Sequence, residues 1–308
     1  MSRGLGDVYK RQALIAPFFL NHSIAITNAG MTDCIKALNE TDNDLDKAIE
    51  WLRKNGAIKA AKKADAIAAE GLTIAKLNNA KNLAAVIEVN CQTDFVAKNQ
   101  QFIDLTNKML DAILANPDAA DYNELSIDGD SFTAAAQALT ATIGEKISFR
   151  RAKVLKATAN QTLGVYTHMN NRVATALLVD GNVDAEVVNN VCMHIAAMNP
   201  KYVTEAEVDQ EWLNNEKEII LEQTKKESNK PAEFLSKIVD GRVSKLLKEV
   251  CLVSQPYVKD NSMTVQQYLA NNKATAVAMI NFILGEGIQK KESDFAAEVA
   301  EQMNANKN

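Results

Sequence analysis

The sequence predicts an α+β protein in which antiparallel sheets are covered by helices. The chain of 308 residues has only 12 Gly and 5 Pro, and it is rich in the strong helix formers Ala, Leu, Lys and Glu. Short apolar runs beside turn residues alternate with longer stretches whose apolar residues recur at helical spacing. A chain of this length is expected to form two or three compact units rather than one core.

The composition is that of an ordinary globular protein, with 47% hydrophobic and 24% charged residues. The net charge of −5 argues against a nucleic-acid-binding protein, because such proteins usually carry a basic patch. The densest lysine cluster, Lys59, Lys62 and Lys63, is expected to be a solvated helix face. No apolar run approaches the roughly 18–20 residues that span a bilayer. We therefore expect no direct contact with nucleic acid or a membrane.

The spacing of the cysteines and histidines does not indicate a metal site. The four cysteines form no CxxC pair and the three histidines are isolated from one another. The cysteine spacing favours free, half-buried thiols in a reducing cytoplasm over a disulfide framework. The motifs GxxxxGK[ST], GxGxxG, GxSxG and HExxH do not occur in the sequence. We therefore expect no cofactor, no metal and no catalytic residues.

The first 27 residues give no clear structural pattern. A short apolar run, Ala13–Leu20, is broken by Pro17 and superficially resembles a signal peptide, but nothing beyond it indicates secretion. We expect residues 1–27 to be poorly ordered or atypical.

Residues 28–56 predict a small helical module. Apolar residues recur at helical spacing from Met31 to Leu38 and from Leu45 to Leu52, and Gly56 is expected to end the second helix. Residues 57–71, rich in Ala and Lys, are expected to form a helical linker.

Residues 72–160 predict the first subdomain of the core. Thr73–Leu77 and Leu83–Val89 are typical of a β-hairpin. A helix is expected after Thr93, a second helix after Ser131, and an edge strand over Ile147–Leu155.

Residues 161–284 predict a second subdomain with a related order of elements. The expected elements are the hairpin strands Gly164–His168 and Val173–Val179, a helix over Ala185–Met198, and the final apolar stretch Ala274–Leu284. This order suggests a weak internal duplication of hairpin plus helix.

A helical hairpin is expected to be inserted at residues 204–250. Thr204 and Glu207 match a capping box that would open its first helix, which runs to about Glu227. Ala232–Val250 would return as the second helix, and the pair is either scaffolding or a partner-contacting arm. Residues 285–308 are expected to form a C-terminal module with a short amphipathic helix that carries Phe295.

The stretch Asn90–Asn99 is the strongest candidate for a functional segment. An apolar run leads into it and an amphipathic run leads out, so Asp94 and Phe95 would project from a strand–helix junction. The structural alternative is a helix N-cap at Thr93 or Asp94 with Phe95 in the core.

Matching segments over nearly the whole chain from residue 28 resemble the translation elongation factor Ts family. In family order they are Ala29–Cys34 with Lys36–Leu38, Gly56–Lys63, Glu88–Ala97, Ile143–Glu145, Met193–Ala197 with Pro200, and Glu286–Ile288 with Asp294–Val299. The segment Thr93–Ala97 is the most specific of these.

The resemblance implies a non-enzymatic nucleotide-exchange factor for elongation factor Tu. It implies an N-terminal module like those that bind ubiquitin, a two-part α+β core, the inserted hairpin and the C-terminal helix. The residues matching Asp94, Phe95, Val96 and Ala97 wedge into the nucleotide domain of Tu near its magnesium site in the family. Four further positions match family contacts with Tu: Ile143, Gly144, His194 and Phe295.

Two departures and two alternatives accompany this resemblance. The family has an amphipathic helix before residue 27 that Ala13–Ile26 does not supply, and Ile35 stands where many relatives carry lysine. His194 is alternatively a satisfied core histidine beside Val191, Ile195 and Met198. From a different functional class, the alternative is a helical adaptor that binds partners without exchange activity.

Overall fold

The computed structural model describes residues 20–23, 29–227 and 232–289, and it confirms the α+β fold class. The helices are α2 (Met31–Glu40), α3 (Leu45–Ala61), α4 (Asp94–Ala97), α5 (Gln100–Ala115), α6 (Phe132–Ile143), α7 (Ala185–Met198), α8 (Gln210–Glu227), α9 (Ala232–Val250) and α10 (Val265–Asn271). The strands are β1 (Glu70–Leu77), β2 (Leu83–Cys91), β3 (Ser126–Ile127), β4 (Asp130–Ser131), β5 (Ile147–Lys156), β6 (Gln161–His168), β7 (Val173–Asp180), β8 (Pro256–Tyr257), β9 (Asp260–Thr264) and β10 (Thr275–Ile283).

Two three-stranded antiparallel sheets form the body of the molecule. Their orders are β1-β2-β5 and β10-β7-β6, so the second strand of a hairpin lies in the middle of each sheet. We refer to β1, β2 and β5 with α4–α6 as the N half, and to β6, β7 and β10 with α7 as the C half. The order of hairpin, helix and third strand repeats in the two halves, and β5 lies at a sheet edge, as the sequence predicts.

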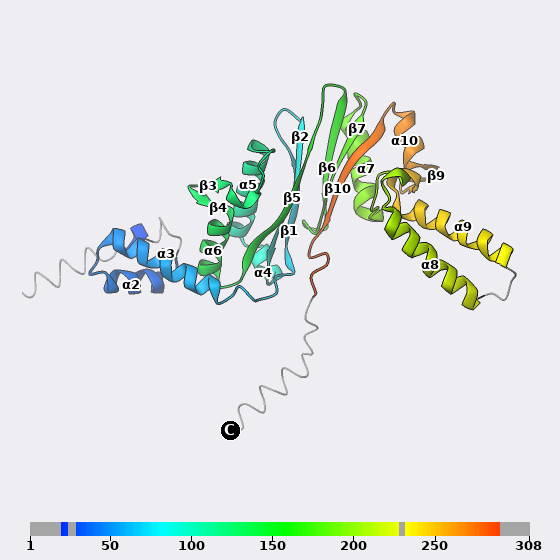
Figure 1. Cartoon of the computed structure of the whole chain (residues 1–308). Helices are drawn as coiled ribbons and strands as arrows, with labels where there is room; N and C mark the ends of the chain where they lie inside the picture. Colours follow the sequence, from blue (N-terminus) through cyan, green and yellow to red (C-terminus); the bar gives the residue numbers. More distant parts are fainter. Residues whose placement is uncertain (1–19, 24–28, 228–231, 290–308) are drawn as a thin grey trace, which may run out of the picture.

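The two sheets pack against each other, and helices cover their outer faces (Figure 1). Side chains on a strand alternate between its two faces. Ala85, Ile87 and Val89 of β2 therefore pack against α5 and α6, whereas Ala84 and Val86 face the C-half sheet. β7 lies in the same way between the N-half sheet and α7. Each large apolar side chain buried here contributes about 1.5–3 kcal/mol.

The small helical pair α2 and α3 differs from the sequence prediction at its end. Helix α3 does not end at Gly56 but continues to Ala61, and the linker expected to be helical to residue 71 is helical only in its first part. Gly56 lies where α3 crosses α6, and a Cβ built on Gly56 would lie 3.2 Å from the Cβ of Ala141. Glycine is therefore used here for close packing of two helices rather than for ending one.

The segment before α2 is only partly described. Leu20 lies in a helical stretch, residues 20–23, and packs against the cluster formed by Cys34, Ala37 and Leu38. For residues 1–19 and 24–27, the expectation of poor order or an atypical structure lies outside the described residues.

Helices α8 and α9 form the predicted hairpin, and they project from the body at the end opposite to α2 and α3 (Figure 1). The prediction of a capping box at Thr204 is wrong, because the Thr204 side chain makes no cap hydrogen bond and precedes only a short 3-10 turn. Glu207 instead accepts a hydrogen bond from the backbone N–H of Val203 at 2.9 Å. The cap of α8 is Asp209, whose carboxylate accepts from the N–H groups of Glu211 and Trp212.

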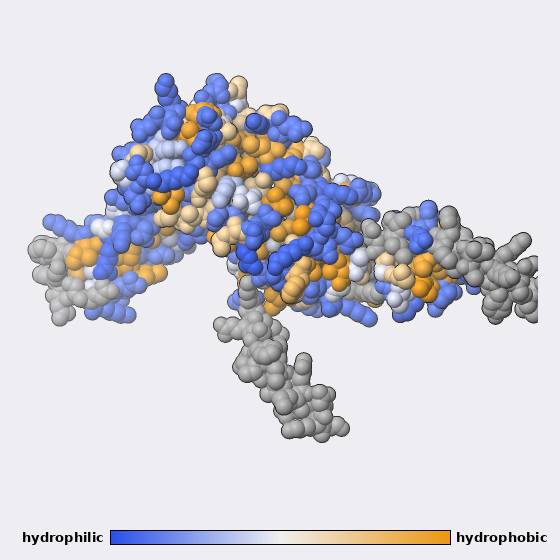
Figure 2. All heavy atoms as spheres, turned by 180° about the vertical axis from the view of Figure 1, so that it is seen from behind, coloured by the Kyte–Doolittle hydropathy of each residue, from blue (hydrophilic) through white to orange (hydrophobic). Residues whose placement is uncertain are grey.

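The surface seen from behind is mostly hydrophilic, with apolar patches between the hydrophilic side chains (Figure 2). Among the described helices, none is long and apolar enough to cross a membrane. The four cysteines are free, as predicted, but they are fully buried rather than half-buried, because each lies within a packed apolar cluster.

Candidate functional site

The sequence-predicted segment forms a single helical turn between β2 and α5. Thr93 is the N-cap of α4, and its Oγ1 accepts a hydrogen bond from the N–H of Val96 at 3.4 Å. The single helix expected after Thr93 is thus two helices. The chain breaks at Asn99, whose side chain accepts from the N–H of Gln101 at 2.8 Å and so caps α5.

The four predicted residues of this turn divide between core and solvent. Val96 and Ala97 are buried in the core between β2 and α5, with 6% and 9% of their surface exposed. Phe95 is 80% exposed, more than any other large hydrophobic residue that the structure describes. The alternative that places Phe95 in the core is therefore wrong. Aromatic residues are enriched in the cores of protein–protein interfaces, so Phe95 is a candidate contact residue.

Asp94 lies on the exposed side of the same turn and pairs with Lys98. The Lys98 ammonium donates to the Asp94 carboxylate at 2.7 Å and lies 6.0 Å from the centroid of the Phe95 ring. The hydrogen bond from Lys98 lowers the pKa of Asp94, and the positive charge of Arg172 adds to this effect. Asp94 is therefore a carboxylate at neutral pH, held beside an exposed aromatic ring.

The N-terminal end of the turn is anchored by Glu145. The backbone N–H of Thr93 donates to Glu145 Oε2 at 3.1 Å, and the Thr93 hydroxyl lies 3.0 Å from both carboxylate oxygens. Glu145 follows Gly144, which ends α6 in the left-handed conformation with φ of 86°. Ile143, the last residue of α6, is half-buried against the N-half core. The structure thus brings the predicted positions Ile143 and Gly144 to the loop that anchors α4.

The strand register places a turn of the C half at the same end of the body. The β6–β7 turn reaches β1, because the N–H and hydroxyl of Thr73 both donate to the carbonyl of Asn171. Arg172 of this turn forms an ion pair of 2.5 Å with Glu70. Glu70 pairs with Cys91 in the sheet, so this contact lies next to the start of α4.

His194 is fully buried in the C half, on helix α7. Its Nδ1 accepts from the N–H of Val258 at 3.2 Å, so its Nε2–H donates to Gln255 Oε1 at 2.8 Å. Burial lowers the pKa of His194, partly offset by the bond to Gln255. The residue has the geometry of a satisfied, neutral core histidine. Phe295 lies outside the described residues.

A buried charged cluster beside β2 was not recognised from the sequence. The fully buried Glu88 carboxylate binds Arg150 at 2.8 Å and Arg151 at 2.6 Å, and it accepts from the N–H of Gly285 at 2.8 Å. Burial would raise the pKa of Glu88, but these three hydrogen bonds outweigh it and lower the pKa. The cluster joins both sheets, because Gly285 lies two residues after the end of β10. Its sequence signal is a charged residue in a largely apolar strand.

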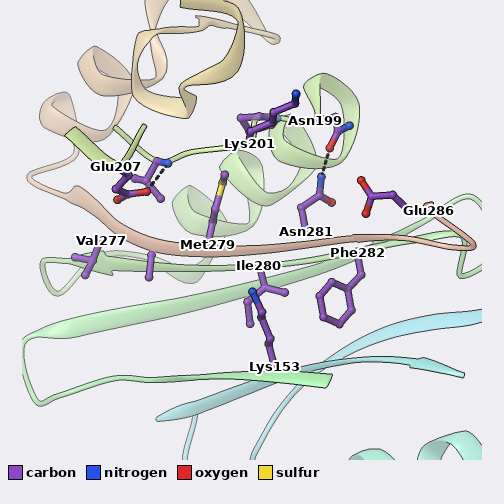
Figure 3. A pocket seen from close by; sticks show the side chains of 13 residues that line it. Lys153, Asn199, Lys201, Glu207, Val277, Met279, Ile280, Asn281, Phe282 and Glu286 are labelled. Carbon is purple, nitrogen blue, oxygen red and sulfur yellow. Dashed lines mark hydrogen bonds between the residues drawn. The ribbon is translucent and has the colours of Figure 1, made fainter. Parts of the chain in front are cut away.

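A hollow of about 500 Å³ lies along β10, away from the predicted site residues that the structure describes. Met279 and Asn281 line it from one face of β10, and Ile280 and Phe282 from the other (Figure 3). The Asn281 amide donates to Asn199 at 2.7 Å. Within the described residues, no group of three or more His, Cys, Asp or Glu side chains could hold a metal ion.

Comparison with known proteins places this architecture in a family. A family model described as elongation factor TS matches residues 92–286. The elongation factor Ts of Ureaplasma urealyticum is 53% identical over 279 residues, covering 90% of this chain and 95% of the relative. Those of Malacoplasma penetrans and Mycoplasmoides gallisepticum are 48% and 44% identical, with 90% and 91% of this chain and 94% and 96% of the relatives covered. The match extends over the exposed Asp94–Phe95 turn and both sheets, and the chain therefore belongs to the elongation factor Ts family of translation elongation factors.

Proposed function

We propose that this chain is a guanine-nucleotide exchange factor that binds elongation factor Tu in its GDP form and promotes GDP release. The observation that carries the proposal is the exposure of Phe95 at 80% beside the ionised Asp94, on a turn held at both ends. In a member of this family, that turn is the element suited to enter a partner. The protein would work in the cytoplasm, without a cofactor and without catalytic residues of its own.

The mechanism that we propose is insertion of the turn near the magnesium site of Tu. Phe95 has only two side-chain torsions to order on binding, so a rigid aromatic ring loses little entropy when it enters an apolar pocket. The Asp94 carboxylate would compete for donors and water around the ion. Weakening the hold on magnesium removes positive charge from the diphosphate, and GDP then dissociates faster.

Val96 and Ala97 have a different part in this proposal. Their side chains are buried in the N-half core, so they hold the turn in place while Asp94 and Phe95 make contact. The loop with Ile143 and Gly144 adjoins the turn and would lie at the same interface. His194 would act from within the C half, by holding the loop that carries Val258. We also propose that residues 28–56 and the C-terminal module with Phe295 make further contacts with Tu.

The test is the release of labelled GDP from elongation factor Tu, with and without this protein. We expect strong acceleration by the parent and a loss of about thirtyfold or more in Phe95→Ala, the size of a hot-spot residue. Met198→Ala is the matched control, because Met198 is a 45% exposed apolar residue at the end of α7. No acceleration by folded parent protein would contradict exchange activity and favour the adaptor.

A further inference from the structure

We propose that Glu145 is a positioning residue for nucleotide exchange, which fixes the direction of Phe95 by holding Thr93. This inference rests on the proposed exchange function. It concerns a residue that is hydrogen-bonded to Thr93, the residue directly before Asp94 and Phe95. Its basis is the set of contacts around a helix that is too short to hold itself in place.

Helix α4 cannot fix Phe95 by its own hydrogen bonds. It contains four residues, and a single helical turn is unstable alone because nucleation orders several residues for one hydrogen bond. On the exposed side of the turn, Asp94 forms an ion pair with Lys98. Both residues belong to the turn, so this pair does not fix the turn relative to the rest of the protein. Phe95 is largely in solvent. Its direction therefore depends on how the chain is held before and after the turn.

The chain after the turn is held by packing and a cap. Val96 and Ala97 enter the N-half core, and Asn99 starts α5. The chain before the turn is held by Glu145. Hydrogen bonds to an ionised carboxylate are about twice as strong as neutral ones, and the Glu145 carboxylate receives both the N–H and the hydroxyl of Thr93. Thr93 Oγ1 can still accept from the N–H of Val96, so one side chain links Glu145 to the first turn of α4.

Glu145 itself is held on a closed loop. The N–H of Gly144 donates to the carbonyl of buried Thr140 at 2.8 Å, and the N–H of Ile147 donates to the hydroxyl of the same residue at 3.0 Å. On the outer side, the Lys146 ammonium donates to the carbonyl of Ala64 at 2.6 Å. The loop therefore has fixed points before and after Glu145. A carboxylate on such a loop is suited to set the position of another segment.

The left-handed conformation of Gly144 is part of this arrangement. A side chain at φ of 86° is strained, although a Cβ on Gly144 would meet no atom within 4 Å. Gly144 turns the chain at the end of α6 so that the next residue reaches Thr93. The sequence match at Ile143 and Gly144 is then explained by the position of Glu145 as well as by direct contact with a partner.

The experiment compares GDP release from Tu over a range of concentrations of the parent and of Glu145→Ala. If Glu145 only preorganises the turn, Tu can still order the turn of Glu145→Ala when it binds, but the affinity is lower. We expect the half-saturating concentration to rise about tenfold while the rate at saturation stays within about twofold, as ordering one additional segment on binding implies. Phe95→Ala should instead lower the rate at saturation. Glu145→Gln keeps one acceptor oxygen and should recover part of the loss.

The matched control is Asp121→Ala. Asp121 also caps a single-turn helix of the N half, since its carboxylate accepts from the N–H of Asn123 at 2.8 Å. This control should leave the half-saturating concentration unchanged. In the Phe95→Ala background, Glu145→Ala should cause a smaller loss than it does in the parent, because one of the two residues that it positions is gone.

Each outcome decides between the two proposals. A parent that does not accelerate GDP release overturns the exchange function and the role of Glu145 together. An active parent whose Glu145→Ala variant keeps the parent's half-saturating concentration overturns the role of Glu145 alone. The same holds if Glu145→Ala loses activity only in proportion to its unfolded fraction, as measured by thermal unfolding, or if it adds its full effect to that of Phe95→Ala.

Discussion

The two halves of the body follow the same order of elements, but they differ where the middle strand meets its helix. In the C half, β7 runs through Gly181 and Asn182 to Asp184, which caps α7, and Val183 packs against the core. In the N half, β2 runs into the additional turn α4, which presents Phe95 to solvent. The same topology thus gives a plain structural junction in one half and an exposed aromatic turn in the other.

The middle strands of the two sheets, β2 and β7, also differ in where their buried polar side chains lie. β7 is buried through Val179, and its one buried polar side chain, Thr175, donates to the carbonyl of Cys192. β2 begins in the same way but ends with two buried polar side chains, Glu88 and Asn90. Asn90 Nδ2 donates to Glu88 and to the carbonyl of Glu70. Buried polar groups need partners with defined geometry, so they fix positions more sharply than apolar contacts do. In the N half, these buried polar contacts lie at the end of the middle strand that leads into the exposed turn.

The largest expected effect is that of Glu88→Ala on stability. The substitution leaves Arg150 and Arg151 without their buried partner and the Gly285 N–H without an acceptor. Removing one member of a buried ion pair costs about 3–5 kcal/mol, and the free energy of unfolding in urea should fall by that order. Glu286→Ala is the control, because Glu286 pairs with Arg151 at a half-exposed position, and it should change stability by about 0.5 kcal/mol or less. Equal losses in both variants would contradict the importance of the buried cluster.

An intermediate effect is expected when the junctions are compared directly. Val96 is 6% exposed in the N-half junction, so Val96→Ala should lower the free energy of unfolding by about 2 kcal/mol. Val183 in the C-half junction is only partly buried, and Val183→Ala should cost about half as much. Urea unfolding of both variants measures the difference. A larger loss of unfolding free energy in Val183→Ala than in Val96→Ala would contradict the conclusion that the buried side of α4 is tightly packed.

A smaller effect is expected from pH. Burial lowers the pKa of His194 in the folded chain, below the value of about 6.5 of an unfolded histidine. The unfolded chain therefore takes up a proton first as the pH falls, and His194 should reduce stability progressively from about pH 7 to pH 5. In His194→Gln, the thermal-unfolding midpoint should depend less on pH over this range. His168→Gln, at the exposed end of β6, is the control. If the midpoint of His194→Gln depends on pH as strongly as that of the parent, His194 is not the cause of the pH dependence.

Elements with strong local patterns could be predicted from the sequence. The apolar run of β7, helix α7 and both helices of the α8–α9 hairpin lie close to where periodicity placed them. The errors occur where a long-range contact overrides a local signal. Gly56 packs against Ala141 instead of ending α3, and Asp209 rather than Thr204 caps α8. The break between α4 and α5 at Asn99 was not predicted, because the helical spacing of apolar residues continues across it.

The candidate site was predicted from the sequence, but its geometry was not. The resemblance identified Asp94 and Phe95, but their exposure depends on Val96 and Ala97 turning inward. The anchor Glu145 is 52 residues from Thr93 along the chain, and Arg150 is 62 residues from Glu88. Spacing rules describe neighbours on one helix or strand, so contacts of this kind become visible only in the folded chain.

The central claim is that the exposed turn couples binding of this chain to release of GDP. The most direct test is the ratio of its affinities for nucleotide-free and GDP-bound elongation factor Tu. By thermodynamic linkage, this ratio equals the factor by which the chain weakens the binding of GDP. We predict a large ratio for the parent and for Met198→Ala, and a ratio at least tenfold smaller for Phe95→Ala. The same ratio in the parent and in Phe95→Ala would contradict the account.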